Sequence, residues 1–144
     1  MKIFNQSIGI CILSLLITSC SSQLNYTPKV PNNEVNCVDE IKQVLEEQIK
    51  NTPEEVIVTS KYIKIKTSIM KRSVWTGGIA SQPKTTTIFF ESIGKIKLFQ
   101  KRSYYIIQIL SKNGRLKYKL ILYDNDTAES FIDCMYAMMK RNSL

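Results

Sequence analysis

The stretch that decides the fold class is ESIGKIKLFQKRSYYIIQILSKNGRLKYKLILYDNDTAESFIDCMYAMM, residues 91–139. Its first part is rich in Ile, Leu, Tyr and Phe and partly alternates apolar with polar side chains, which predicts strands over 95–100, 104–111 and 116–123. The Asn-Gly pair at 113–114 is a strong hairpin signal. We therefore expect the last two strands to be antiparallel neighbours.

The second part of this stretch predicts a C-terminal helix. Asp126 and Glu129 form a capping pattern at its start, and Lys140 and Arg141 place positive charge in its last turn. The apolar side chains between them recur at helical spacing and form one face, namely Phe131, Cys134, Met135 and Met138. A helix with so apolar a face must pack on the sheet.

Toward the N-terminus, the chain predicts further strands and then another helix. Strands are expected over 55–59, 62–70 and 85–91, and apolar positions at helical spacing predict a helix from about residue 36 or 37 to 51. The expected fold class is α+β. It consists of an antiparallel sheet of about six or seven strands with an N-terminal and a C-terminal helix packed on it.

The order of these elements over residues 88–139 is strands, an Asn-Gly turn, a strand, an acidic cap and a helix. This order resembles the pleckstrin-homology-like superfold. The resemblance implies a scaffold that is used for binding far more than for catalysis. It does not fix the function, because one fold carries many functions.

The N-terminal segment MKIFNQSIGICILSLLITSC, residues 1–20, has the pattern of a signal rather than of a fold. Lys2 gives it a positive start, and the apolar run 8–17 is shorter than the ~20 residues that a bilayer-spanning helix needs. Its end, Ile-Thr-Ser-Cys at 17–20, resembles the lipobox of bacterial lipoproteins. The resemblance implies cleavage before Cys20, acylation of that cysteine with fatty acids such as palmitate, and a folded part outside the cytoplasm.

The residues after Cys20 extend this interpretation. Ser21 and Ser22 stand where many lipoproteins of the inner membrane carry Asp, so the resemblance favours anchoring in the outer membrane of the cell envelope. Two alternatives stay open, an ordinary cleaved signal and a retained membrane anchor. We expect a signal peptide over 1–19, a lipidated flexible tether rich in Ser, Gln, Asn and Pro over 20–36, and a single domain over 37–144.

The cysteines fit an oxidising compartment. With Cys20 acylated and the signal removed, Cys37 and Cys134 remain, and we expect them to form a disulfide that closes a loop of 97 residues, 134 minus 37. Chain entropy makes such a bridge worth on the order of 4 kcal/mol. The alternative is a pair of buried thiols.

No motif for catalysis or for a cofactor stands out. The chain has no His, which excludes His-based catalytic triads and the usual zinc sites. The run Asp124-Asn125-Asp126 begins like a calcium loop but lacks the required Gly and the final Glu, so we interpret it as a turn and helix cap. We expect no enzyme, cofactor or metal site, and keep a carboxylate-based cell-wall or glycan hydrolase as an unfavoured alternative.

The net charge of +8 suggests a first candidate surface. Basic residues alternate along three expected strands and would form one basic sheet face if those strands were neighbours. They are Lys64, Lys66, Lys95, Lys97, Arg115, Lys117 and Lys119. Such a face favours anionic lipids or polymers and loses affinity with salt, but it could also serve solubility alone. Nucleic acid is not an expected partner outside the cytoplasm.

The second candidate surface is the expected loop from Lys71 to Lys84, which holds the only Trp of the chain. A loop of this length in a compact domain is functional or mobile. We expect Val74, Trp75 and Ile79 to contact a protein partner, the alternative being that Trp75 covers the edge of the core. The leading functional hypothesis is a lipid-anchored, non-enzymatic binding or assembly module of the envelope, followed by a module for anionic lipids or polymers.

Overall fold

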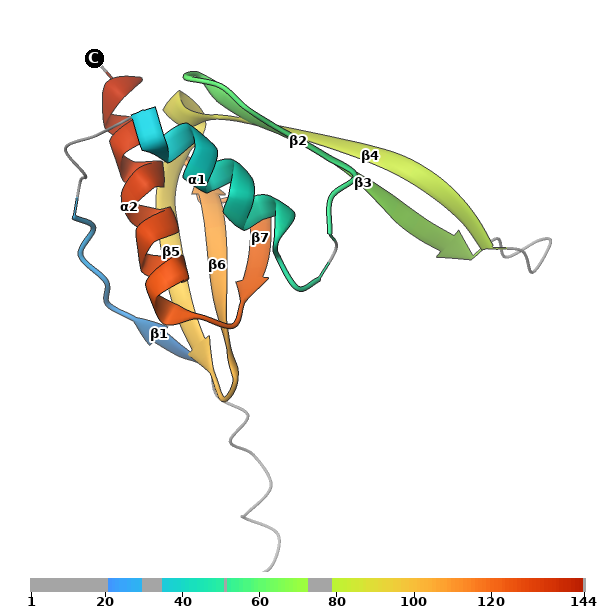
Figure 1. The fold of residues 1–144 in the computed structure, drawn as a ribbon, viewed down its shortest axis with the longest axis horizontal. Coiled ribbons are helices and arrows are strands. Elements are labelled where there is room, and N and C mark those ends of the chain that lie inside the picture. The colour runs from blue at the N-terminus through green and yellow to red at the C-terminus, as the bar shows by residue number, and fades with distance from the viewer. Residues whose placement is uncertain (1–20, 30–34, 51, 73–78, 144) are drawn as a thin grey trace, which may run out of the picture.

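The computed structural model describes residues 21–29, 35–50, 52–72 and 79–143. A four-stranded sheet carries two helices on one face, and a three-stranded sheet projects from this body (Figure 1). The predicted α+β class, with antiparallel strands and two helices, is confirmed for the described residues. Their seven strands are divided between two sheets.

The body sheet contains β1 (Ser22–Leu24), β5 (Ile93–Lys101), β6 (Tyr104–Ser111) and β7 (Leu116–Leu122) in the order β1-β5-β6-β7. All three pairings are antiparallel. β6 and β7 are joined through the Asn-Gly turn, where Gly114 has a φ of +78° that favours glycine. The predicted hairpin is therefore confirmed.

The helices α1 (Val35–Glu46) and α2 (Asn125–Arg141) cover one face of this sheet (Figure 1). Their apolar stripes meet the inward-facing strand residues in one buried core. Its largest fully buried members include Ile41, Leu45, Phe131, Met135, Met138, Ile107, Ile109 and Leu120. The opposite face of the body sheet carries no helix in the described part of the chain.

The second sheet has the order β2-β3-β4 and consists of β2 (Glu55–Val58), β3 (Tyr62–Arg72) and β4 (Ile79–Phe89). Both pairings are antiparallel. Its base joins the core through Val56, Ile63, Ile65 and Ile88, which are all buried. A short 3-10 helix, η1 (Phe90–Ser92), then leads from β4 into β5.

The two helix boundaries differ from the prediction for local reasons. The first helix ends at Glu46 instead of residue 51, because the Gln48 side chain turns into the core and donates to the Leu45 carbonyl oxygen and the Tyr118 hydroxyl. The cap of α2 is Asp124 rather than Asp126. Its carboxylate accepts hydrogen bonds from both the backbone N–H and the hydroxyl of Thr127, each at 2.7 Å.

The expected loop from Lys71 to Lys84 is shorter than predicted. β3 continues to Arg72 and β4 begins at Ile79, so most of the expected loop pairs as strand. The expected strand 85–91 is the second half of β4 followed by η1. Gln, Pro, Lys and Thr dominate residues 82–87, and this polar composition hides a strand because neither face is buried.

The expected flexible tether also differs over its described part, residues 21–29. Ser22–Leu24 form β1 and pair with Leu98–Gln100 of β5. Leu24 and Tyr26 then pack against the core. Backbone pairing does not require apolar composition, which is why the polar sequence of this segment concealed it.

Candidate functional site

We call residues 67–72 of β3 and 79–84 of β4 the arm. Pairing of β2 ends where Glu55 faces Lys66, so beyond this point only two strands continue. Their register stays regular until Arg72 faces Ile79. Figure 1 shows the arm pointing away from both helices. A two-stranded ribbon without a core of its own therefore extends from the body.

The two edges of the arm differ in chemistry. On β4, Pro83 lacks an N–H group and Lys84 is exposed, and both features oppose pairing with a further strand. On β3, residues 67–72 contain no proline, and no described strand covers their outer edge. The β3 edge is the better template for a partner strand.

The expected partner loop is only partly described. Val74 and Trp75 lie outside the described residues. Ile79 is the first residue of β4 and faces Arg72. The segment that was expected to contact a partner thus connects the two strands at the far end of the arm.

An aromatic pair with one exposed member, Phe89, lies at the base of the same sheet. Tyr62 faces Phe89, and their rings meet edge to face with centroids 5.8 Å apart. Phe89 is 48% exposed, which is unusual for so large an apolar side chain. Lys64 and Lys66 follow on the same strand face and are exposed.

The structure divides the predicted basic face into two groups. Lys64 and Lys66 belong to β3, in the projecting sheet. The other basic residues belong to β5 and β7 or lie next to β7 in the body sheet, where β6 lies between these two strands. Gln108 on β6 faces both Lys97 on β5 and Lys119 on β7. These two lysines lie on one strand row, about 10 Å apart at the usual strand spacing.

The remaining members of the predicted basic face surround this row in the body sheet. Lys95 faces Leu110 at the start of β5, Lys117 falls at the irregularity in the β6–β7 pairing, and Arg115 precedes β7. We call Lys97 and Lys119, the two lysines that face Gln108, the lysine row. The condition for a single basic face, that the three strands are neighbours, is not met, because β3 lies in a different sheet from β5 and β7 and β6 lies between these two.

A groove of 560 Å³ lies between α1 and the start of α2 and is acidic. Five carboxylates line it, Asp39, Glu40, Glu47, Asp124 and Asp126, and its lining contains no basic residue. Among the described residues, no group of three or more His, Cys, Asp or Glu side chains could hold a metal ion. The groove therefore concentrates negative charge between the two helices.

Two of these carboxylates already have structural partners. Glu40 accepts a hydrogen bond from the Ser130 hydroxyl and joins α1 to α2. Hydrogen bonds from the side chain and backbone of Thr127 hold the pKa of Asp124 below its usual value. A glycosidase acid needs a raised pKa, so the shift of Asp124 is in the opposite direction.

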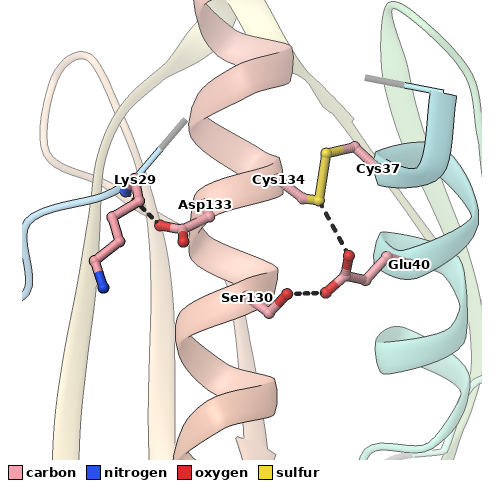
Figure 2. The surroundings of a disulfide bond; sticks show 6 residues. All are labelled: Lys29, Cys37, Glu40, Ser130, Asp133 and Cys134. Atoms are coloured by element: carbon pink, nitrogen blue, oxygen red, sulfur yellow. Dashed lines mark hydrogen bonds between the residues drawn. A yellow bond between two sulfur atoms is a disulfide. The ribbon is translucent and has the colours of Figure 1, made fainter. Parts of the chain in front are cut away.

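The predicted disulfide joins the two helices. Cys37 on α1 and Cys134 on α2 are bonded, with their Cα atoms 4.9 Å apart, and both are buried (Figure 2). Glu40 Oε2 lies 3.4 Å from the Cys134 sulfur. A buried bridge beside a carboxylate is shielded from attacking thiolates, which favours a structural role.

Asp133 fastens the N-terminal segment to α2. Its Oδ1 accepts hydrogen bonds from the Tyr26 hydroxyl at 2.8 Å and from the Lys29 backbone N–H at 2.7 Å, the second of which Figure 2 shows. Burial and the Asp133 carboxylate raise the pKa of Tyr26 to about 12. We call these two hydrogen bonds the Asp133 latch.

Sequence reasoning missed the latch residues and Glu40. Asp133 interrupts an otherwise apolar helical stretch, and that position is a signal that could have marked it as a contact residue. Nothing in the sequence pairs it with Tyr26, which is 107 residues away along the chain.

Comparison of the chain with protein-family models, curated proteins and solved structures gives no match. Among the described residues, no helix is long and apolar enough to cross a membrane. Cys20 and the lipobox-like run lie outside the described residues.

Proposed function

We propose that this protein is a lipid-anchored, non-enzymatic binding module of the bacterial cell envelope that engages an envelope protein through its arm. The observation that carries the proposal is the ordered two-stranded arm. A hairpin alone is marginally stable in water, and fixing each backbone residue costs about 1–2 kcal/mol. The described distal side chains Ser68 and Ser81–Lys84 are exposed. Burial against the body therefore offsets little of this entropy cost.

The arm also explains why binding is the better proposal than catalysis. The acidic groove has no described metal-ligand group, and two of its carboxylates serve structural hydrogen bonds. The arm, in contrast, presents a β3 edge that no described strand covers, with one hydrogen bond from Ser68 to Glu54 at its start. The Tyr62–Phe89 pair, in which Phe89 is exposed, lies at the base of the same sheet. A partner strand beside β3 would take the place that β2 leaves vacant beyond Lys66.

The lipid anchor is supported by the lipobox-like run at Cys20 alone, and outer-membrane location by the absence of Asp after it. Metabolic labelling with a palmitate analogue tests the anchor directly. The wild-type protein should incorporate the label and sediment with membranes, and Cys20→Ser should do neither. A labelled, membrane-bound Cys20→Ser variant would contradict this part of the proposal.

Photocrosslinking in cells tests the arm. A photoreactive residue is placed at exposed Lys84 of the arm or at position 75, which lies between the two arm strands in the sequence, with exposed Lys112 in the β6–β7 turn as the matched control. We expect the arm positions to give a discrete protein adduct that depends on Cys20, and Lys112 to give none. Equal adducts from all positions, or none from the arm, would contradict a role of the arm in binding.

A truncated variant separates binding from folding. Lys66 and Thr85 face each other, so residues 67–84 can be replaced by Asn-Gly to close a short hairpin. The strand pairing at the base of the sheet, Ile63 with Ile88 and Ile65 with Thr86, remains. We expect the thermal midpoint to stay near that of the wild type while the partner identified by crosslinking no longer co-purifies.

The lysine row favours a second candidate function, binding of an anionic polymer or lipid headgroup. Lys97 and Lys119 flank Gln108 on a sheet face that no described helix covers. Lys97→Gln with Lys119→Gln should weaken binding to lipopolysaccharide and flatten its dependence on salt, whereas Lys112→Gln should not. Binding that neither salt nor these substitutions change would rule out this candidate.

A further inference from the structure

The chain enters the domain at one end of the body sheet, and it enters as a strand. Ser22 faces Gln100 and Leu24 faces Leu98, so β1 runs along the last part of β5. Beyond β1 the Asp133 latch holds the chain on α2. Residues 22–29 are thus fixed at both ends, and the first described residue, Ser21, directly precedes β1.

Covalent geometry limits how far the lipid anchor point can be from the β5–β6 turn. Cys20 lies two positions before Ser22 in the sequence, and an extended chain covers at most about 3.6 Å per residue. Partner Cα atoms in an antiparallel pair lie about 5 Å apart. Chain connectivity therefore limits the distance between the lipid anchor point and Gln100, the residue before the turn, to about 12 Å.

The side chains at this turn suit a membrane interface. Lys101 and Arg102 are cationic, and the Lys101 ammonium lies 5.9 Å from the centroid of the Tyr104 ring. Tyr105 follows, and it faces Leu122, next to which Tyr123 is 67% exposed. Tyrosines with apolar rings and polar hydroxyls gather at the headgroup level of bilayers, where basic residues meet anionic lipids.

The acidic residues at this end of the sheet are Asp124 and Asp126, at the start of α2. The positive end of the helix dipole offsets their charge, and Asp124 is occupied by its hydrogen bonds with Thr127. The turn itself, residues 101–104, contains cations and a tyrosine but no acid.

We infer that the β5–β6 turn, with Lys101, Arg102 and Tyr104, rests on the phospholipid headgroups of the membrane that holds acylated Cys20. The inference depends on the proposed lipid anchor. It means that the N-terminal segment sets the orientation of the domain instead of acting as a slack spacer. The nine residues of β5, about 30 Å, separate this turn from η1 and the base of the projecting sheet.

Two matched labels test this orientation. Ser103→Cys places a thiol in the turn, and Ser81→Cys places one on the arm, both at exposed serines. Cys37 and Cys134 are bonded to each other, and lipid occupies Cys20, so the introduced thiol alone reacts with an environment-sensitive fluorophore. The full acylated protein is reconstituted in vesicles of phosphatidylethanolamine and phosphatidylglycerol that contain a nitroxide on the headgroup.

The nitroxide should quench the label at residue 103 several-fold more than the label at residue 81. Equal quenching of the two labels, in protein that floats with the vesicles, would overturn the orientation while leaving the anchor intact. Protein that does not float would refute the anchor, and the orientation with it. Crosslinking of the arm reports on the partner separately, so its failure does not affect this result.

The latch is tested in the same assay. Asp133→Ala removes the acceptor of both hydrogen bonds, and Asp133→Asn, which keeps an acceptor oxygen, is its control. We expect Asp133→Ala to reduce quenching at residue 103 without changing flotation, and Asp133→Asn to preserve it. Undiminished quenching in Asp133→Ala would show that the latch does not set the orientation.

Discussion

Removing the Cys37–Cys134 disulfide should cost this domain a large part of its stability. The bridge spans a sequence separation of 97 residues, and chain entropy assigns about 4.7 kcal/mol to a loop of roughly 100 residues. A domain of ordinary stability has about 5–15 kcal/mol in total. The Cys37→Ala, Cys134→Ala double variant should therefore be marginally folded at room temperature.

Urea unfolding of the domain, followed by circular dichroism, measures this loss. The oxidised wild type, the fully reduced wild type and the double variant are compared. Both disulfide-free forms should be about 4–5 kcal/mol less stable than the oxidised form and within ~1 kcal/mol of each other. A loss of less than ~1 kcal/mol in both would refute the loop-entropy argument.

The rate of reduction is a second measurement of the same bridge. Cys37 is 1% exposed and Cys134 3%, so a thiol reagent must wait for a local opening. Glu40 Oε2, 3.4 Å from the Cys134 sulfur, also repels an attacking thiolate. Glu40→Gln should keep an acceptor for Ser130 and speed reduction, and an unchanged rate would indicate that burial alone protects the bond.

Three further predictions concern the fold. Gly94→Ala should lower the free energy of unfolding in urea by about 1–3 kcal/mol, because a Cβ atom at residue 94 would lie 2.6 Å from Lys112 Cα. A variant as stable as the wild type would contradict this close approach. Asp124→Ala should lower the thermal midpoint by removing the cap of α2, whereas Asp124→Asn should preserve it at neutral pH; equal midpoints for both would exclude capping. Tyr26 has its pKa raised to about 12, so folding stability should fall between pH 10 and pH 12, where the native state keeps a proton that the unfolded state has lost. In Tyr26→Phe this alkaline loss, measured by urea unfolding at each pH, should be smaller, and an equal loss would exclude the Tyr26 contribution.

The sequence predicts the elements whose patterns are local. β6 was predicted over its observed range, and β7 and α2 nearly so. The alternation of apolar and polar residues, the Asn-Gly turn and the apolar stripe of the helix are all patterns of residues close together in the sequence. The disulfide was also predictable, since the lipobox interpretation leaves one pair of cysteines. These features require no knowledge of how distant segments meet.

Features that depend on backbone pairing or on distant contacts were not predictable. Residues 22–24 and 81–84 are mostly polar, and they form strands because a neighbouring strand offers hydrogen bonds. Of these residues, only Leu24 packs against the core. The same holds for the Asp133 latch, which joins residues more than a hundred positions apart. An interpretation based on composition therefore assigned paired strand residues to a flexible tether and to a loop.

The two surfaces that we propose lie at opposite ends of β5, and this arrangement restricts the partner. If the β5–β6 turn rests on the membrane, the nine residues of β5, about 30 Å, separate this turn from the base of the projecting sheet, and the arm runs from that base to the side of the body (Figure 1). A flexible tether would let the arm reach the membrane surface, but β1 and the Asp133 latch oppose that motion. A partner of the arm must therefore extend well beyond the headgroups, which favours an envelope protein with a large domain outside the bilayer over one confined to the membrane.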